Sequence, residues 1–200
     1  MESKIIYMTN IDRRYFMMRR ALDELIADGE MPASSQVVKT EDGSVWSASW
    51  EEKLRGSALV MIRFMGNTIR TKFWTACMHF LSREGIPYYM DAAGSAEEEC
   101  IERVAAKDIA AMKAYSFYGG LTNYKNLWRY VGALFEEPLH AVEPPSPICW
   151  AGIYHPGMEK NFMTDLTSYE KTFLREGRPT LGLLFYRDEW IWDDLHYQKA

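Results

Sequence analysis

The chain has 200 residues, of which 48% are hydrophobic, and its formal net charge is −5. No run approaches the roughly 20 apolar residues that a membrane-spanning helix needs, and Lys and Arg are scattered rather than gathered into a stripe, which argues against a nucleic-acid backbone as the main partner. The three cysteines, Cys77, Cys100 and Cys149, lie far apart. An odd, sparse set of thiols is typical of a reducing compartment, so we expect a cytoplasmic protein.

The first half of the chain alternates between short apolar runs and amphipathic segments. The apolar runs predict strands at residues 4–11, 36–40, 57–64 and 86–90, and the amphipathic segments predict helices at 12–28, 49–55 and 71–84. In the first of these helices the spacing places Tyr15, Met18 and Leu22 on an apolar face, with Arg14 on the opposite side. This alternation predicts an α/β fold with a doubly wound, mostly parallel sheet of the flavodoxin-like kind.

A helical segment is expected to follow the fourth strand. Ser95 has the character of a helix N-cap, and Glu97, Glu98 and Glu99 would lie in a first turn, where negative charge suits the helix dipole. We therefore predict a helix from Ser95 to about Phe117, a break at Gly119-Gly120, and a further helix over about 122–135. Residues 1–138 would then form one α/β domain with a helical C-terminal half.

The remainder of the chain is predicted to contain a linker and a second unit. Pro144, Pro145 and Pro147 favour extended backbone, so residues 139–160 are predicted as a Pro-rich linker that carries a Tyr-His-Pro turn. The apolar run Pro179–Tyr186 predicts a buried strand. We interpret residues 161–200 as the first strand–helix unit of a second, truncated α/β domain.

Ligands of parallel sheets bind beyond the carboxyl ends of the strands. In the predicted sheet that edge carries Asn10, Asp12, Gly66, Asn67 and Asp91, from which we take Asn10 and Asn67 as candidate ligand-binding residues. The segment after the first strand contains no glycine, so it cannot form the pyrophosphate loop of a dinucleotide-binding domain. The phosphate-binding loop of ATPases is absent as well. If ATP is used, we expect another subunit to hydrolyse it.

The histidines do not form a metal site by their spacing. His79, His140, His155 and His196 are widely separated, and no Ser-His-Asp or Cys-His arrangement is visible. We therefore predict no metal ligand, catalytic residue or cofactor of this segment. By its place in the turn before Pro156, His155 is interpreted as a cap of the linker turn.

Four segments of the chain resemble a known family. They are Ala58–Gly66, which is similar to a Val-Val-Arg-Leu-x-Gly strand, Gly119–Tyr130, which is similar to Gly-Gly-x-x-Asn-x-x-Asn-Leu, Ala151–Gly157, and Pro179–Arg187. In this order they resemble the N-terminal part of the large cobaltochelatase subunit (CobN-type proteins), which is related to the magnesium-chelatase H subunit.

The resemblance implies a function for the longer protein. It implies ATP-dependent insertion of cobalt into a tetrapyrrole, a corrin precursor of cobalamin biosynthesis, by a ligase that works with separate AAA-type ATPase subunits. This segment would form part of the cavity wall or lid and would be inactive alone. Tyr154 and His155 would be further substrate-binding candidates, and the second interpretation of His155, that it presents a neutral imidazole to a cavity between the domains, follows from the resemblance. The alternative is a non-catalytic α/β module that binds a ligand or docks a partner.

Overall fold

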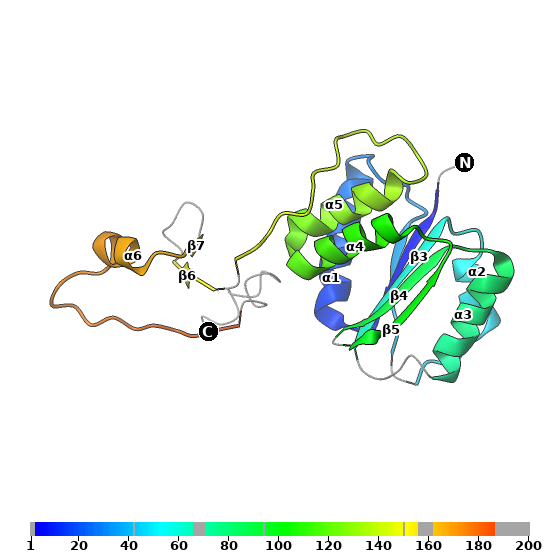
Figure 1. The fold of residues 1–200 in the computed structure, drawn as a ribbon, viewed down its shortest axis with the longest axis horizontal. Coiled ribbons are helices and arrows are strands. Elements are labelled where there is room, and N and C mark those ends of the chain that lie inside the picture. The colour runs from blue at the N-terminus through cyan, green and yellow to red at the C-terminus, as the bar shows by residue number, and fades with distance from the viewer. Residues whose placement is uncertain are drawn as a thin grey trace. The chain divides into compact units, whose positions relative to one another are not determined.

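In a computed structural model of the chain, a five-stranded sheet lies between two layers of helices (Figure 1). The structure describes residues 3–41, 43–65, 71–93, 95–149, 151–155 and 162–186. The strand order is β2-β1-β3-β4-β5, and the strands are β1 (Ile5–Thr9), β2 (Gln36–Lys39), β3 (Leu59–Met65), β4 (Tyr88–Ala93) and β5 (Ser95–Glu102).

The first four strands are parallel. Tyr7 of β1 lies opposite Val37 of β2 on one side and Met61 of β3 on the other, and Met61 in turn lies opposite Tyr89 of β4. The chain adds β2 on one side of β1 and then continues with β3 on its other side, which is the flavodoxin-like order. The predicted doubly wound, mostly parallel sheet is therefore confirmed.

The prediction of a helix beginning at Ser95 is wrong. Residues Ser95–Glu102 form β5, which pairs antiparallel with β4 so that Met90 lies opposite Cys100, and the next helix is α4 (Ala106–Tyr118). The acidic run that suggests a helix N-terminus instead belongs to the edge strand of the sheet. Charged residues on an edge strand discourage pairing with another molecule, which offers a physical reason for this composition.

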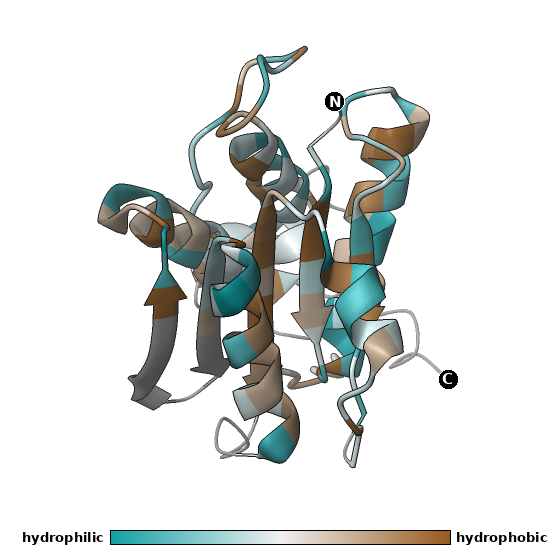
Figure 2. Cartoon of the chain, turned by 90° about the vertical axis from the view of Figure 1, so that its right-hand side faces the viewer, coloured by the Kyte–Doolittle hydropathy of each residue, from teal (hydrophilic) through white to brown (hydrophobic). Residues whose placement is uncertain are grey.

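The helices cover both faces of the sheet. One layer consists of α2 (Ala48–Leu54) and α3 (Lys72–Glu84), and the other of α1 (Asp12–Ala27), α4 and α5 (Gly120–Gly132). Along β1 the side chains alternate, so that Ile6 and Met8 belong to the core with Trp74 and Leu81 of α3. Figure 2 shows the result: the central strands are largely hydrophobic, and the helices carry hydrophilic residues on their outer surfaces.

The layer of α1, α4 and α5 is centred on a large aromatic side chain. Trp128 of α5 is fully buried, and its indole nitrogen donates to the carbonyl oxygen of Met18 at 3.2 Å. Arg14 is also buried here, with 8% of its surface exposed, and its guanidinium carbon lies 5.6 Å from the centre of the Tyr124 ring. The assignment of Arg14 to the polar face of its helix is therefore wrong, because α5 covers more of α1 than the periodicity indicates.

The chain divides into two units, Met1–Ser146 and Pro147–Ala200. In the described part of the second unit, β6 (Ile153–Tyr154) pairs with β7 (Phe162–Met163), and α6 (Leu166–Phe173) follows. Residues 179–186 form no strand, and Leu181 is 87% exposed. The prediction of a buried strand at Pro179–Tyr186 is thus wrong, because an apolar run becomes a buried strand only when other segments pair with it and cover it.

Candidate functional site

The carboxyl edge of the sheet, where β1 and β3 end side by side, is the point at which the strand order reverses. Ligands of doubly wound folds bind at this position. Asn10 follows β1 directly, and its side-chain amide donates to the carbonyl oxygen of Met65 at 3.1 Å while its side-chain oxygen accepts from the backbone nitrogen of Met65 at 2.8 Å. Asn10 thus imitates a peptide group and joins the end of β3 to the end of β1.

Two further contacts fasten the loops at this edge. The backbone nitrogen of Thr40 donates to the carbonyl oxygen of Thr9 at 2.9 Å, and Lys39 Nζ lies 2.7 Å from Asp12 Oδ1. The hydrogen bond to Asp12 raises the pKa of Lys39. Ile11 is the N-cap residue of α1, and Asp12, the first residue of the helix, pairs through its carboxylate with β2.

A crevice of about 170 Å³ lies beside these loops. Its walls are formed by Asn10, by Thr40, Glu41, Gly43 and Ser44 after β2, and by Thr71–Trp74 at the start of α3. Thr40 is 3% exposed, and its hydroxyl oxygen has no hydrogen-bond partner among the residues that the structure describes. A buried hydroxyl without a partner costs about 1–3 kcal/mol, so this side chain stores some strain in the wall of the crevice.

The first turn of α3 supplies positive electrostatic potential to the crevice. Thr71 is the N-cap, and its side-chain oxygen accepts from the backbone nitrogen of Trp74 at 3.4 Å. By helix geometry, the backbone N–H groups of Lys72 and Phe73 have no carbonyl partner within the helix. Together with the ammonium group of Lys72, they make this end of the crevice suited to a negatively charged group.

The other candidate residue of this edge, Asn67, lies outside the described residues, as does Gly66. The side chain of Asp91 is likewise not described. Of the predicted edge residues, the structure therefore places Asn10 at the crevice and Asp12 beside it.

Tyr154 and His155 lie in the second unit. The imidazole ring of His155 stacks on the Phe173 ring, with ring centres 4.0 Å apart and an angle of 29° between the planes, and contacts Tyr169 edge-on at 6.0 Å. Tyr154 meets Phe185 at 6.3 Å. Both residues thus join an aromatic cluster, which Asp165 supports by capping α6: its carboxylate accepts from the backbone nitrogens of Thr167 and Ser168, each at 3.1 Å.

The segment that resembles Gly-Gly-x-x-Asn-x-x-Asn-Leu has a structural function. Asn123 lies in α5, and its side-chain amide donates to the carbonyl oxygens of Gly119 at 2.7 Å and Ser146 at 3.0 Å. Its side-chain oxygen accepts from the backbone nitrogen of Ser146 at 2.8 Å, and Tyr115 donates to the carbonyl oxygen of Glu143 at 2.6 Å. Asn123 and Tyr115 therefore hold residues 139–146, which we call the strap, against the helices.

A second hollow, of about 280 Å³, lies where the strap meets the turn after α1. Its main charged groups are bound to each other: Arg129 Nε donates to Glu30 Oε2 at 2.6 Å and Nη2 donates to Oε1 at 2.7 Å. The hydrogen bonds from Arg129 lower the pKa of Glu30, whose side chain is 6% exposed. This bidentate pair fixes the end of α5 to the turn after α1.

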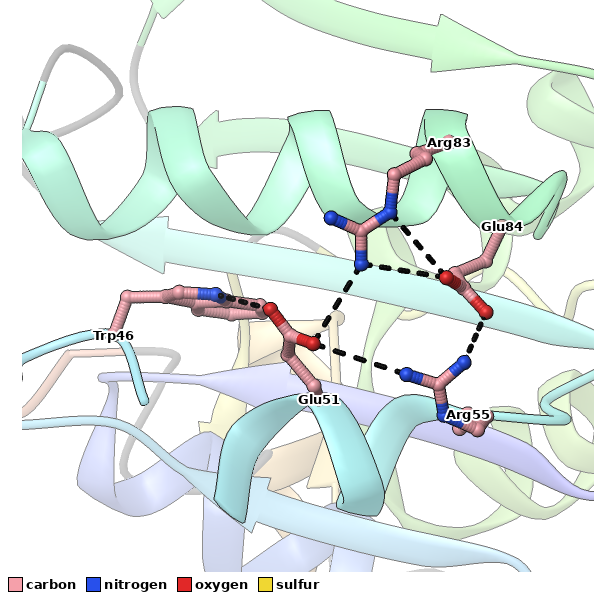
Figure 3. Close-up of polar contacts among 5 residues, drawn as sticks. All are labelled: Trp46, Glu51, Arg55, Arg83 and Glu84. Atoms are coloured by element: carbon pink, nitrogen blue, oxygen red, sulfur yellow. Dashed lines mark hydrogen bonds and ion pairs between the residues drawn. The ribbon is translucent and has the colours of Figure 1, made fainter. Parts of the chain in front are cut away.

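Sequence reasoning missed a hollow of about 490 Å³ between α2 and α3. Figure 3 shows the polar network at its side: Glu51 accepts from the Trp46 indole nitrogen at 3.4 Å and lies 3.6 Å from Arg83 Nη2, while Glu84 is bound by Arg55 and Arg83. Both guanidinium groups also lie over the Phe80 ring. These charges are engaged with each other and fasten α2 to α3. Their separation along the chain leaves no signal in the sequence.

Among the residues that the structure describes, no three His, Cys, Asp or Glu side chains come together as a potential metal site. No helix there has the length and apolar character of a membrane span. Cys77 is buried against the sheet, and desolvation raises the pKa of its thiol to about 12, so this cysteine is a core residue rather than a nucleophile.

Comparison with known proteins connects the second half of the chain to a family. Residues 113–200 match the CobN/Magnesium Chelatase family model, which confirms the resemblance seen in the sequence. The chain is also 34% identical, over 84 residues, to an uncharacterized protein of Methanocaldococcus jannaschii; the match covers 42% of this chain and 7% of that protein.

A solved structure has a similar fold. The catalytic subunit of cobaltochelatase from Mycobacterium tuberculosis matches 78% of this chain with a TM-score of 0.55 and 14% identity, over 12% of its own length. The chain therefore spans a small part of both proteins. At this identity the likeness concerns the fold, which is an α/β architecture in both.

Proposed function

We propose that this chain is part of the large subunit of a tetrapyrrole metal chelatase, corresponding to its N-terminal part, because residues 113–200 match the CobN/Magnesium Chelatase family model. The family match is the observation that carries the proposal. The strap, with Tyr115, Asn123 and Ser146, and the aromatic cluster around His155 both lie within the matched residues, so the matched segment has defined structural tasks.

The reaction that we propose for the whole enzyme is ATP-dependent insertion of cobalt into a corrin precursor. Insertion of a divalent ion displaces the N–H protons at the centre of the macrocycle, so the enzyme must bend the macrocycle, accept the released protons and remove water from the ion. Such tasks require a large cavity built from several domains. We propose that this chain contributes a wall or lid of that cavity, and that separate AAA-type subunits hydrolyse the ATP.

Within this chain we assign a substrate-contacting role to Tyr154 and His155. The stacking of His155 on Phe173, at 4.0 Å between ring centres, restrains the orientation of the imidazole. A restrained neutral imidazole is suited to accept a proton or to contact the edge of a planar ligand. Asn10 at the sheet edge, and Asn67, which lies outside the described residues, remain further candidates for contacts with the substrate. The small, odd number of cysteines, three in 200 residues, supports a location in the cytoplasm.

A titration of the 200-residue chain with a free-base porphyrin and with a corrin, followed by absorbance in the Soret region, tests this proposal. We expect saturable binding that weakens about tenfold, or by roughly 1.4 kcal/mol, in His155→Ala. His79→Ala is the matched control, because His79 is exposed on α3 in the first unit, and it should bind as the wild type does. Absence of binding at high micromolar tetrapyrrole would rule out a direct substrate contact by this chain.

The alternative function is that of a non-catalytic docking module. It is favoured by one observation: Leu181, Leu183 and Leu184 of the second unit are all largely exposed, and exposed apolar side chains in sequence are typical of an interaction surface. Sedimentation of the chain in the absence of tetrapyrrole distinguishes the two functions. A docking module that binds itself would sediment faster as its concentration rises, and Leu184→Ser would reverse that effect.

A further inference from the structure

We propose that the hydrogen bonds of Asn123 to the main chain of Ser146, which we call the strap anchor, set the length of the connection between the two units of the chain. While the strap anchor is formed, the connection begins at Pro147. When it is released, the strap, residues 139–146, becomes part of the connection. The proposal assigns a conformational role to a residue of α5. It goes beyond the chelatase assignment and does not depend on it.

The strap anchor lies at the boundary between the units. The first unit ends at Ser146, and the second begins at Pro147. The side-chain amide of Asn123 donates to the carbonyl oxygen of Ser146 at 3.0 Å, and its side-chain oxygen accepts from the backbone nitrogen of Ser146 at 2.8 Å. Asn123 itself is buried in α5, with 2% of its surface exposed. One buried side chain thus fixes both main-chain polar groups of the last residue of the first unit.

The prolines around Ser146 make this contact specific. Pro144, Pro145 and Pro147 have no backbone N–H, so in residues 144–147 only Ser146 can donate a main-chain hydrogen bond. Proline also keeps its own backbone and that of the preceding residue extended, and proline-rich segments are semi-rigid. Release of Ser146 therefore frees the whole proline-rich stretch rather than a single residue.

The side chains of the strap add little to its attachment. None of residues 139–146 is buried, only Val142 and Pro145 are half-buried, and Leu139 is 70% exposed. A further contact is the hydrogen bond from Tyr115 to the carbonyl oxygen of Glu143 at 2.6 Å. Segments with few buried apolar contacts open locally at a low cost in free energy. The strap can therefore be released while the sheet and the helices of the first unit stay folded.

Release of the strap changes how far the second unit can move from its point of attachment. Residues 139–146 in extended conformation add at most about 25 Å to the connection. The effective concentration of a tethered unit falls as a flexible tether becomes longer than the distance that it must span. The strap anchor therefore restricts the second unit to a smaller range, and its release widens that range.

Nitrogen-15 relaxation of the 200-residue chain tests where the connection begins. In the wild type we expect an order parameter of about 0.85 for the Ser146 amide, as in rigid backbone, and values below about 0.6 for the amides of Ile148 and Cys149. In Asn123→Ala the values for Val142 and Ser146 should also fall below about 0.6. A Ser146 amide that is as mobile as Ile148 in the wild type would overturn the proposal.

A second pair of variants changes only the strap, because Asn123 is buried and its replacement also affects the core. Ser146→Pro removes the N–H that Asn123 binds, and Ser146→Ala is the matched control that keeps it. Elastase cleaves after small residues such as Ala141 and Val142, at a rate that follows the population of the open strap. We expect cleavage within the strap, identified by fragment mass, to be about tenfold faster in Ser146→Pro and Asn123→Ala and unchanged in Ser146→Ala.

Small-angle X-ray scattering tests the length of the connection. The maximum dimension of the chain should be larger in Asn123→Ala and Ser146→Pro than in the wild type, by no more than about 25 Å, and unchanged in Ser146→Ala. The proposal is overturned if the maximum dimension or the rate of cleavage in the strap is the same as in the wild type in both released variants. Failure of these tests leaves the tetrapyrrole titration unaffected, because that experiment reports on His155 in the second unit.

Discussion

Two apolar runs of this chain have similar compositions and opposite environments. Leu59–Met65 is β3, in the middle of the sheet, and Leu59 to Ile62 are all buried between β1 and β4 and beneath the helices. Residues 181–186 of the second unit are equally apolar, yet Leu181 and Tyr186 are exposed. The difference teaches that an apolar sequence permits a buried strand, whereas neighbouring strands and covering helices create one.

The largest expected effect on the free energy of unfolding comes from removing a side chain of the core around Trp128. Trp128→Ala removes a fully buried indole and its hydrogen bond to Met18, so we expect the free energy of unfolding to fall by about 3–5 kcal/mol. Urea denaturation followed by circular dichroism measures this. If the variant does not fold, the smaller deletion Val131→Ala in the same helix should still cost more than 1 kcal/mol or so. A loss below that value in both variants would contradict the packing described for the first unit.

The ion pair between Glu30 and Arg129 is expected to make the next largest contribution to the free energy of unfolding, and this contribution depends on pH. Hydrogen bonds from Arg129 lower the pKa of Glu30, so the pair's contribution is complete above the ordinary carboxyl pKa and is lost as the pH falls through the lowered value. Glu30→Gln should therefore cost about 1.5–3 kcal/mol at neutral pH and progressively less in acid.

Urea denaturation of the wild type and of Glu30→Gln across this pH range measures the difference. Glu24→Gln is the control, because Glu24 pairs with Arg20 and Lys125 at a more exposed site, and it should cost at most about 1 kcal/mol. A Glu30→Gln penalty that stays constant into acid would show that the carboxylate charge is not what stabilises the turn.

The strap is held more weakly than the core, and removing the hydrogen bonds that hold it should have a local effect. Asn123→Ala removes three hydrogen bonds, two of them to Ser146, so we expect a cost of about 1–2 kcal/mol. Hydrogen exchange at the Ser146 amide should accelerate at least about tenfold, because local opening becomes easier. Tyr130→Phe removes only the bond to Asp108 and should leave the Ser146 amide as protected as before. Equal acceleration of exchange in both variants would contradict the role of Asn123 in holding the strap.

The smallest effect is expected in the exposed run of the second unit. Leu184→Ala should change the free energy of unfolding by no more than about 0.5 kcal/mol, because exposed side chains without specific contacts contribute little. Urea denaturation of Leu184→Ala and Trp128→Ala under the same conditions compares the two free energies of unfolding directly. A cost near that of a core deletion would show that residues 181–186 are covered in solution.

The fold of the first unit was largely predictable, and its exception is instructive. The strands β1 to β4 follow from apolar runs separated by amphipathic helices, since local pattern and tertiary environment agree there. At Ser95 they conflict: the acidic run has the local signature of a helix start, but the free edge of β4 offers backbone hydrogen bonds to an antiparallel strand. Pairing across the sheet is not visible in a local window, so β5 could not be predicted.

The candidate site was predictable in position but only partly in its residues. Asn10 follows a predicted strand, so its place at the carboxyl edge could be deduced. Thr40 and Lys72 could not be selected, because the burial of one hydroxyl and the meeting of two loops depend on the folded backbone. Similarly, the contact between Asn123 and the strap could not be predicted, because its partner Ser146 lies 23 residues away.

The hydrogen bonds that hold the strap have a consequence for the sequence changes that it tolerates. Tyr115 and Asn123 hold main-chain atoms of Glu143 and Ser146, and none of these bonds involves a strap side chain. Residues 139–146 can therefore drift in composition, except that proline is excluded at position 146, where the N–H is needed. An insertion or deletion of one residue between Glu143 and Ser146 would move a main-chain atom out of hydrogen-bond distance. The strap must therefore keep its length rather than its side chains.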